Sequence, residues 1–333
     1  MNKDNNIIKK NKLGRTNLEI SEITLGGGWV GGLFIDAEYK VMEKAIELAL
    51  EKGINWIDTA ESYSEGVSEK NIGMLMDCLN QNEKLYVSSK ARLDPQSSET
   101  FESQIDRKLD NSLKRLKLDK LNLYQLHNKI SLEKSSETLT EKEILETNGV
   151  AEIMLKLKED QRVQNIGITA LGHTNSIKNV LEMGYFDTAQ IYYNLLNPSA
   201  AFEEENDWND HDFSGLISIC NKHKMGILGI RVFAAGLLAT DIRHGREIPV
   251  TNVINLEEEE RRAHMISDLV GENYGNRAQY ALRYGLSSKN IHSIVIGMAS
   301  LEHLKNSIEA VEMGSLPASI LKDISNLQKS NFL

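Results

Sequence analysis

The stretch Ile54-Asn55-Trp56-Ile57-Asp58 decides the fold class, because a short apolar and β-branched run ends there in an acid. After a polar loop, residues 68–79 show the period of a helix, which we expect Ser68 to cap and Glu69 to favour as a first-turn acid. The next apolar run, Leu85-Tyr86-Val87-Ser88-Ser89-Lys90, repeats the strand pattern. Strand, helix and strand in succession predict a β-α-β unit.

The same succession recurs along the chain. Helical spacing of apolar residues is also clear over residues 40–51 and 101–116. Eight strands alternating with helices predict a (β/α)8 TIM barrel, with a β-hairpin over residues 12–20 ahead of it and a single domain over residues 1–333. The expected strands are Glu22–Leu25, Ile54–Asp58, Leu85–Lys90, Leu121–His127, Asn165–Thr169, Thr188–Tyr192, Gly226–Arg231 and His292–Gly297.

Three connections are longer than the usual links of such a barrel: residues 128–147, 198–212 and 239–256. Each follows a strand or lies near the end of one. Catalytic and binding groups of a barrel lie at the C-terminal ends of its strands, so we expect these loops on that face.

Composition excludes several classes of function. The net charge is −10 with no Lys/Arg cluster, which argues against a nucleic-acid partner. No apolar run reaches the about 20 residues that cross a bilayer, and the polar start lacks the pattern of a signal peptide. Cys78 and Cys220 lie in apolar-periodic stretches, which fits buried thiols in a reducing cytoplasm. Composition leaves open whether the protein is a monomer or a homo-oligomer.

A glycine-rich stretch, Gly26-Gly27-Gly28-Trp29-Val30-Gly31, suggests a Rossmann dinucleotide site. In a Rossmann turn the third glycine lies at the start of a helix, whereas here residues 31–36 come before any helical pattern. Asp58 also lies farther along the chain than the about 20 residues expected for the ribose-binding acid. We therefore interpret this stretch as a loop whose small residues let a ligand approach.

Four residues at or just after the ends of adjacent predicted strands carry the chemistry: Asp58, Tyr63, Lys90 and His127. Reduction of a carbonyl needs a proton for the oxygen as its charge develops. The pKa of a free tyrosine is about 10, and a neighbouring ammonium such as Lys90 favours the phenolate and lowers that pKa. Asp58 would keep Lys90 charged, and His127 would position the carbonyl. Each residue alone has a structural explanation, but together they form a proton relay.

These residues resemble the aldo-keto reductase family. The similar segments run in order along nearly the whole chain, and the most specific one is Asp58-Thr59-Ala60-Glu61-Ser62-Tyr63. Others are Leu13–Thr16, Ser89-Lys90, Tyr124–His127, Ile166–Thr169, Gln190–Asn194, Ala235–Leu238 and Val295–Gly297. The resemblance implies that Asp58, Tyr63, Lys90 and His127 are the catalytic tetrad, on a TIM barrel that binds NADP(H) across its top.

The resemblance also implies a set of cofactor contacts. Gln190 matches the family's strand-six glutamine, whereas Thr169-Ala170 replaces a Ser-Asn pair and Ile230-Arg231 stands where an aromatic residue is usual. Ala299, His303 and Ser307 occupy the positions that meet the adenosine 2′-phosphate and adenine, so NAD(H) is possible besides NADP(H). The full predicted set is Gly27, Gly28, Thr169, Gln190, Arg231, Phe233, Gly236, Leu238, Gly297, Met298, His303 and Ser307.

Two tryptophans, Trp29 and Trp208, are predicted to be apolar walls for a small-molecule carbonyl substrate, while Trp56 is predicted to be core. The acidic and histidine-containing segment 207–212 does not have the spacing of a metal site, and we expect no metal. The function expected is reduction of an aldehyde or ketone, or oxidation of a sugar-like alcohol.

Two alternatives remain open. One is a cofactor-binding regulatory subunit that resembles potassium-channel β subunits. The other is a barrel lyase or hydrolase that uses Lys90 as a Schiff-base amine, an idea that a charged Lys90 beside Asp58 opposes.

Overall fold

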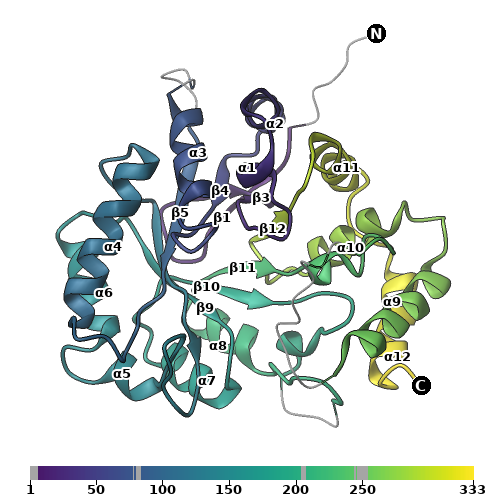
Figure 1. The fold of residues 1–333 in the computed structure, drawn as a ribbon. Helices are drawn as coiled ribbons and strands as arrows, with labels where there is room; N and C mark the ends of the chain where they lie inside the picture. Colours follow the sequence, from purple (N-terminus) through teal and green to yellow (C-terminus); the bar gives the residue numbers. More distant parts are fainter. Residues whose placement is uncertain (1–6, 78, 80–83, 204–207, 244, 246–253) are drawn as a thin grey trace.

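The structure is a computed structural model that describes residues 7–77, 79, 84–203, 208–243, 245 and 254–333 (Figure 1). Eight parallel strands close into a barrel in the order β10-β11-β12-β3-β4-β5-β6-β9. Each lies within a residue or two of the run that predicts it, so the barrel prediction is confirmed. The strands are β3 (Ile23–Gly26), β4 (Trp56–Asp58), β5 (Tyr86–Ala91), β6 (Leu123–Leu126), β9 (Ile166–Ala170), β10 (Thr188–Tyr192), β11 (Gly226–Ile230) and β12 (Ser293–Gly297).

The predicted hairpin is also present and closes the N-terminal end of the barrel. Strands β1 (Lys10–Lys12) and β2 (Glu19–Ser21) pair antiparallel. Buried apolar side chains of the hairpin pack against Trp56, Leu123 and Leu228, which lie near the starts of barrel strands. Trp56 is therefore core, as its strand position predicts.

Helices surround the barrel as the periodicity predicts (Figure 1). In α4, for example, the Thr100 side chain caps the first turn by accepting from the backbone N–H of Ser103, and Ile105 and Leu109 are buried. The helices around the strands are α2 (Tyr39–Glu51), α3 (Val67–Met76), α4 (Phe101–Leu116), α6 (Val150–Glu159), α7 (Thr174–Glu182), α8 (Leu216–Lys222), α10 (Arg277–Leu286) and α11 (Leu301–Glu312). None of the described helices is long and apolar enough to cross a membrane.

The long connections carry short elements on the C-terminal side of the barrel. After β6 come β7 (Lys129–Ile130), β8 (Thr138–Leu139) and α5 (Glu141–Leu145), and after β10 comes the 3-10 helix η1 (Ser199–Ala201). After β11 come η2 (Ala234–Gly236) and α9 (Leu256–Val270), and the chain ends with α12 (Ala318–Lys329) packed on α9. Residues 204–207, 244 and 246–253 of these predicted loops lie outside the described residues.

Two local predictions need correction. Residues 31–36, where no helical pattern was expected, contain a one-turn helix, α1 (Leu33–Asp36). Its buried pair, Leu33 and Phe34, is too short to predict a helix from periodicity. Ser68 is not the cap of α3, which begins one residue earlier, after Gly66 in a left-handed conformation with φ 87°. The buried Ser68 hydroxyl instead pairs with the Thr59 hydroxyl at 2.8 Å, because α3 packs close against the end of β4.

The prediction that both cysteines are buried thiols can be compared with the structure at Cys220. Cys220 is a free, fully buried thiol, and burial raises its pKa to about 12. Cys78 lies outside the described residues.

Candidate active site

A cavity of about 460 Å³ opens at the C-terminal ends of the strands. Every barrel strand contributes to its described lining, through residues of the strand itself or of the segment that follows it, so the cavity lies over the barrel axis. Twelve of the residues predicted from sequence line it: Gly28, Trp29, Asp58, Tyr63, His127, Thr169, Gln190, Arg231, Phe233, Gly236, Gly297 and His303.

Asp58, the last residue of β4, is buried and fully engaged in hydrogen bonds. Its Oδ1 accepts from the Ser88 hydroxyl at 2.7 Å and from Gln125 Nε2 at 3.0 Å. Its Oδ2 accepts from Lys90 Nζ at 2.5 Å. A buried carboxylate is tolerated only with such partners, and these hold Asp58 in a single orientation toward Lys90.

Lys90 lies on β5 beneath the cavity, and its side chain is completely buried. Besides Asp58, its ammonium donates to the Thr59 carbonyl at 2.9 Å and to the Tyr63 hydroxyl at 3.2 Å. Burial by itself lowers the pKa of Lys90, but the charge of Asp58 and the nearby Tyr63 outweigh it and raise the pKa above its ordinary value. Lys90 is therefore a permanent ammonium that faces the Tyr63 oxygen, which argues against a Schiff-base amine.

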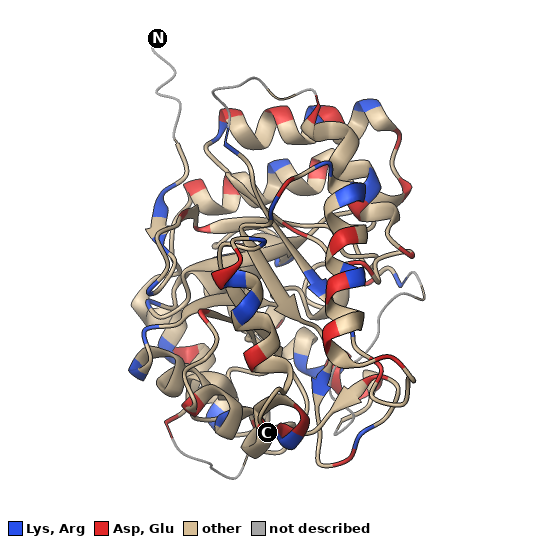
Figure 2. Ribbon diagram, turned by 90° about the vertical axis from the view of Figure 1, so that its left-hand side faces the viewer, with Lys and Arg blue, Asp and Glu red and all other residues tan. Residues whose placement is uncertain are grey.

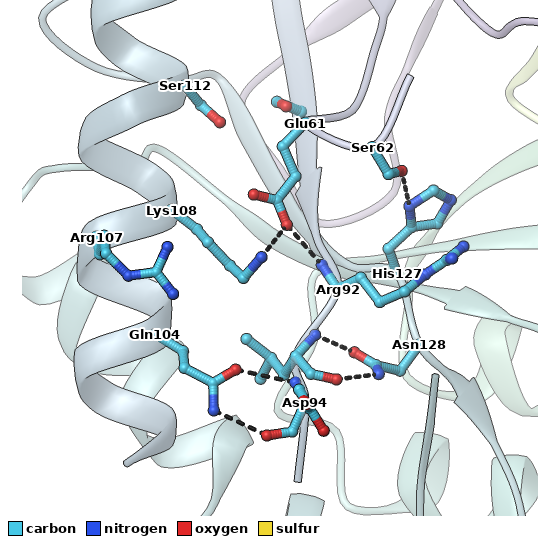
Figure 3. Close-up of polar contacts among 12 residues, drawn as sticks. Glu61, Ser62, Arg92, Asp94, Gln104, Arg107, Lys108, Ser112, His127 and Asn128 are labelled. Carbon is cyan, nitrogen blue, oxygen red and sulfur yellow. Dashed lines mark hydrogen bonds and ion pairs between the residues drawn. The ribbon is translucent and has the colours of Figure 1, made fainter. Parts of the chain in front are cut away.

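Tyr63 and His127 lie next to each other at the cavity. Their rings pack edge to face with centroids 5.7 Å apart. His127 Nδ1 lies 3.3 Å from the Ser62 hydroxyl, as Figure 3 shows. Withdrawal from water lowers the pKa of His127 well below its usual 6.5, and the charges of Lys90 and Arg92 lower it further. Near neutral pH His127 is thus an uncharged imidazole that keeps an N–H for a hydrogen bond.

Helix α3 anchors the loop that carries Tyr63. Glu69 on α3 is fully buried, and it accepts from the Ser89 hydroxyl at 2.5 Å and from Arg115 Nε at 2.6 Å. The Ser68–Thr59 contact fastens the same helix to the end of β4. The loop between Asp58 and Tyr63 is therefore fixed at both ends, which sets the distance from Tyr63 to Lys90.

On the opposite side of the cavity, two buried polar atoms lack partners among the described residues. They are Thr169 Oγ1 on β9 and Gln190 Nε2 on β10. Buried donors and acceptors are normally satisfied, so an unsatisfied pair that lines a cavity indicates a ligand with hydrogen-bonding groups.

The segment after β11 has an unusual backbone. Arg231, Ala234 and Ala235 adopt positive φ values of 62°, 46° and 58°, followed by Gly236 at 110°. Such strain at non-glycine residues is costly, and here the Asn194 side chain helps to hold the turn by donating to the Arg231 carbonyl at 2.9 Å. Burial lowers the pKa of Arg231 from its ordinary value, and the nearby Tyr192, Tyr63 and Glu259 oppose that effect.

At the end of β12, helix α11 begins beside the cavity. Ser300 caps the helix, and His303 Nδ1 accepts from the backbone N–H of Ala299 at 3.2 Å. His303 lines the cavity, whereas Ser307 turns its hydroxyl back to the His303 carbonyl at 2.9 Å.

Several predicted contacts do not reach the cavity. Met298 and Leu238 are buried in the core, and a side chain at Gly27 would meet the Ser68 hydroxyl at 2.6 Å, so that glycine serves helix packing. Ser307 also lies outside the cavity lining. Trp208, predicted to be a substrate wall, instead packs against Phe202 and Phe332 near the end of the chain, which corrects its assignment.

The cavity lining also includes residues outside the predicted set, among them the polar residues Ser62 and Arg92. Arg92 stands just beyond the end of β5, so the strand-end rule that finds Lys90 and His127 was sufficient to find it. The sequence does not reveal which way such a long side chain extends, into the cavity or into solvent.

Comparison with known proteins identifies the family. The model named "Aldo/keto reductase family" matches residues 22–329. Aldo-keto reductase YhdN of Bacillus subtilis is 28% identical over 195 residues, which cover 57% of this chain and 53% of that protein. L-galactose dehydrogenase of Arabidopsis thaliana is 24% identical over 312 residues, which cover 93% of this chain and 90% of that protein.

A solved structure shows the same fold. The holo form of aldo-keto reductase AKR11C1 from Bacillus halodurans superposes with a TM-score of 0.72, at 20% identity, over 96% of both chains. The barrel, its cavity at the strand ends and the family match agree. The chain belongs to the aldo/keto reductase family and is an oxidoreductase that acts on carbonyl groups with a nicotinamide cofactor.

Proposed function

We propose that this enzyme reduces an aldehyde or ketone of a small molecule with NADPH, and that Tyr63 donates the proton. The observation that carries the proposal is the chain of contacts from Asp58 to Lys90 to Tyr63, at 2.5 and 3.2 Å. The same residues would run the reaction backwards on a sugar-like alcohol. We propose the cytoplasm as its location and residues 1–333 as a single functional domain.

The roles of the relay residues follow from their charges. As a carbonyl oxygen gains negative charge, the Tyr63 hydroxyl supplies a proton, and the Lys90 ammonium stabilises the phenolate that remains. Asp58 keeps Lys90 charged and oriented. The uncharged His127 donates a hydrogen bond that places the carbonyl oxygen next to Tyr63.

The other side of the cavity fits a nicotinamide cofactor. Thr169 Oγ1 and Gln190 Nε2 offer buried, unsatisfied groups of the kind that bind a carboxamide. Arg231, Phe233, Gly236, Gly297 and His303 line the same side and would hold the rest of the molecule. When bound, the cofactor supplies the hydride, and this chain's residues orient the substrate and deliver the proton.

The proposed preference for NADPH over NADH depends on the region around His303. His303 is the ionisable residue there that lines the cavity, and its position is fixed by the Ala299 N–H. Because Nδ1 accepts from Ala299, the other ring nitrogen carries the N–H and can donate to a phosphate oxygen.

The test combines binding and turnover. Fluorescence titrations with NADPH and NADH are run in parallel, and reduction of aromatic and aliphatic aldehydes is followed with the cofactor that binds more tightly. Tyr63→Phe should lower the turnover rate about 10²–10⁴-fold and leave the affinity for the cofactor nearly unchanged. Tyr86→Phe, at the opposite end of the barrel, is the matched control and should retain full activity.

Wild-type turnover by Tyr63→Phe would disprove the proton-donor role. Tight cofactor binding with no turnover of any aldehyde would instead favour the regulatory-subunit alternative.

A further inference from the structure

The charged side chains that line the cavity include more cations than anions. Its described lining contains one carboxylate, Asp58, which Lys90 already neutralises. It also contains two guanidinium groups, Arg92 and Arg231. On the face shown in Figure 2, acidic and basic residues are interspersed over the outer helices. The protein as a whole has a net charge of −10, so cationic side chains gathered in the cavity stand out against it. Such a cluster attracts anionic ligands.

The two arginines lie on opposite sides. Arg92 follows β5 and Arg231 follows β11, and these strands are four positions apart in a closed barrel of eight. Arg231 shares its side with Gly236, Gly297 and His303, the proposed cofactor side. Arg92 shares its side with Tyr63 and His127, where the reacting carbonyl is placed. An anionic ligand bound on the cofactor side is therefore not expected to neutralise Arg92.

The backbone around Arg92 is firmly held (Figure 3). The Arg92 N–H donates to Glu61 Oε1 at 3.2 Å, and the same oxygen accepts from Lys108 Nζ at 2.6 Å. The next residue, Leu93, exchanges two hydrogen bonds with the Asn128 side chain, at 2.8 and 2.7 Å. Lys108 thus neutralises the charge of Glu61. Glu61 binds the backbone N–H of Arg92 and not its guanidinium.

The guanidinium of Arg92 is weakly engaged by comparison. Its Nε is buried and has no hydrogen-bond partner among the described residues. Its Nη1 lies 3.5 Å from Glu137 Oε1, and the Glu137 side chain is 72% exposed, so water screens this pair strongly. Figure 3 shows the Arg92 side chain extending beside His127. A guanidinium on a firmly held backbone, with an unsatisfied donor, is well suited to a second ligand.

We propose that Arg92 binds an anionic group of the substrate, so that the preferred substrates are carbonyl compounds that also carry a carboxylate or a phosphate. This inference rests on the proposed function, because it takes the carbonyl to lie at Tyr63 and His127. Carboxylate and phosphate present the same pair of oxygens to the guanidinium fork. Arg92 acts on substrate affinity and orientation, while the proton relay stays with Tyr63.

The test compares charged and neutral substrates in matched pairs. They are 4-oxobutanoate and 5-oxopentanoate, each with its methyl ester, and glyceraldehyde 3-phosphate with glyceraldehyde. The variants are Arg92→Gln and Arg92→Lys. The control is Arg107→Gln, which removes the same charge from α4 nearby, where Arg107 is half exposed, pairs with Glu99 and lies outside the cavity lining.

For at least one pair, the wild type should prefer the charged member, and Arg92→Gln should raise KM for that substrate about 10- to 100-fold while changing its neutral partner less than about twofold. Arg92→Lys should recover part of the loss, and Arg107→Gln should match the wild type. The carboxylate and phosphate arms show which anion is preferred.

Equal kcat/KM for charged and neutral members of every pair, or equal losses for both in Arg92→Gln, would overturn the inference while the proposed reductase stands. If no carbonyl compound is reduced, the proposed function fails, and calorimetry with succinate still tests the site. Succinate binding that Arg92→Gln abolishes and Arg107→Gln preserves supports an anion site, and absence of binding to the wild type overturns it.

Discussion

The two halves of the cavity differ in how their polar groups are satisfied. On the side of β4 to β6, Asp58, Lys90 and Tyr63 are joined to one another by hydrogen bonds within the protein. On the side of β9 and β10, Thr169 Oγ1 and Gln190 Nε2 are buried without partners among the described residues. The Asp58–Lys90–Tyr63 chain is therefore satisfied within the protein, whereas the Thr169–Gln190 pair is left for a ligand. This difference predicts opposite responses to the same kind of substitution.

The largest effect should follow from breaking the Asp58–Lys90–Tyr63 chain. Lys90→Met leaves the buried Asp58 carboxylate without its cation, which costs about 3–5 kcal/mol of unfolding free energy. Turnover should fall about 10²–10⁴-fold, since the Tyr63 phenolate loses its stabilising charge. Urea unfolding and steady-state kinetics measure the two quantities.

The double variant Asp58→Asn/Lys90→Met sharpens the same test. It should regain most of the stability, because no buried charge is left without a partner. It should regain none of the activity. Recovery of turnover would show that the ion pair is structural only.

The next effect concerns Glu259, a buried carboxylate behind the ligand-binding half. Burial raises its pKa to about 7, the neighbouring Asp210 adds to the rise, and Arg231 and Arg262 oppose it. The folded state thus holds a proton that the unfolded chain has already released above pH 4.5, so stability falls as pH rises from 4.5 to 7. Glu259→Gln should remove this loss of stability. The free energy of unfolding should rise on the order of a few kcal/mol above pH 7 and change little near pH 4.5.

Thermal unfolding of the wild type and Glu259→Gln at pH 5 and pH 8 provides the measurement. An identical change in Tm at both pH values would mean that Glu259 titrates normally.

A smaller and more direct comparison removes one hydroxyl from each half. Ser88→Ala deletes the donor to Asp58 Oδ1 and the acceptor of the Trp56 indole N–H, and should cost about 1–3 kcal/mol. Thr169→Val deletes a hydroxyl that has no partner among the described residues, and without cofactor it should leave stability unchanged or raised. Similar losses in both variants, measured by urea unfolding without ligand, would contradict the distinction between the two halves.

The smallest effect is expected in binding. Gln190→Leu should weaken NADPH binding about 2- to 10-fold, the worth of one neutral hydrogen bond, with no loss of stability in the absence of cofactor. Fluorescence titration gives the affinity. An unchanged Kd would place the carboxamide elsewhere in the cavity.

The sequence by itself determined the barrel and the positions of the proposed relay. Apolar runs of strand length and helical spacing are local signals, and all eight predicted strands are present. The C-terminal ends of parallel strands meet at one end of a barrel, so Asp58, Lys90 and His127 were predictable as neighbours without coordinates.

Only the tertiary structure decided what depends on contacts between distant segments. Ser68 looked like a helix cap but pairs with Thr59, and Trp208 looked like a cavity wall but packs on Phe332. Arg92 became a candidate binding residue only when its unsatisfied Nε and its place beside His127 were seen. Strand periodicity reports which face of an element is buried, whereas the direction of a long side chain and its partners are set by packing across the whole chain.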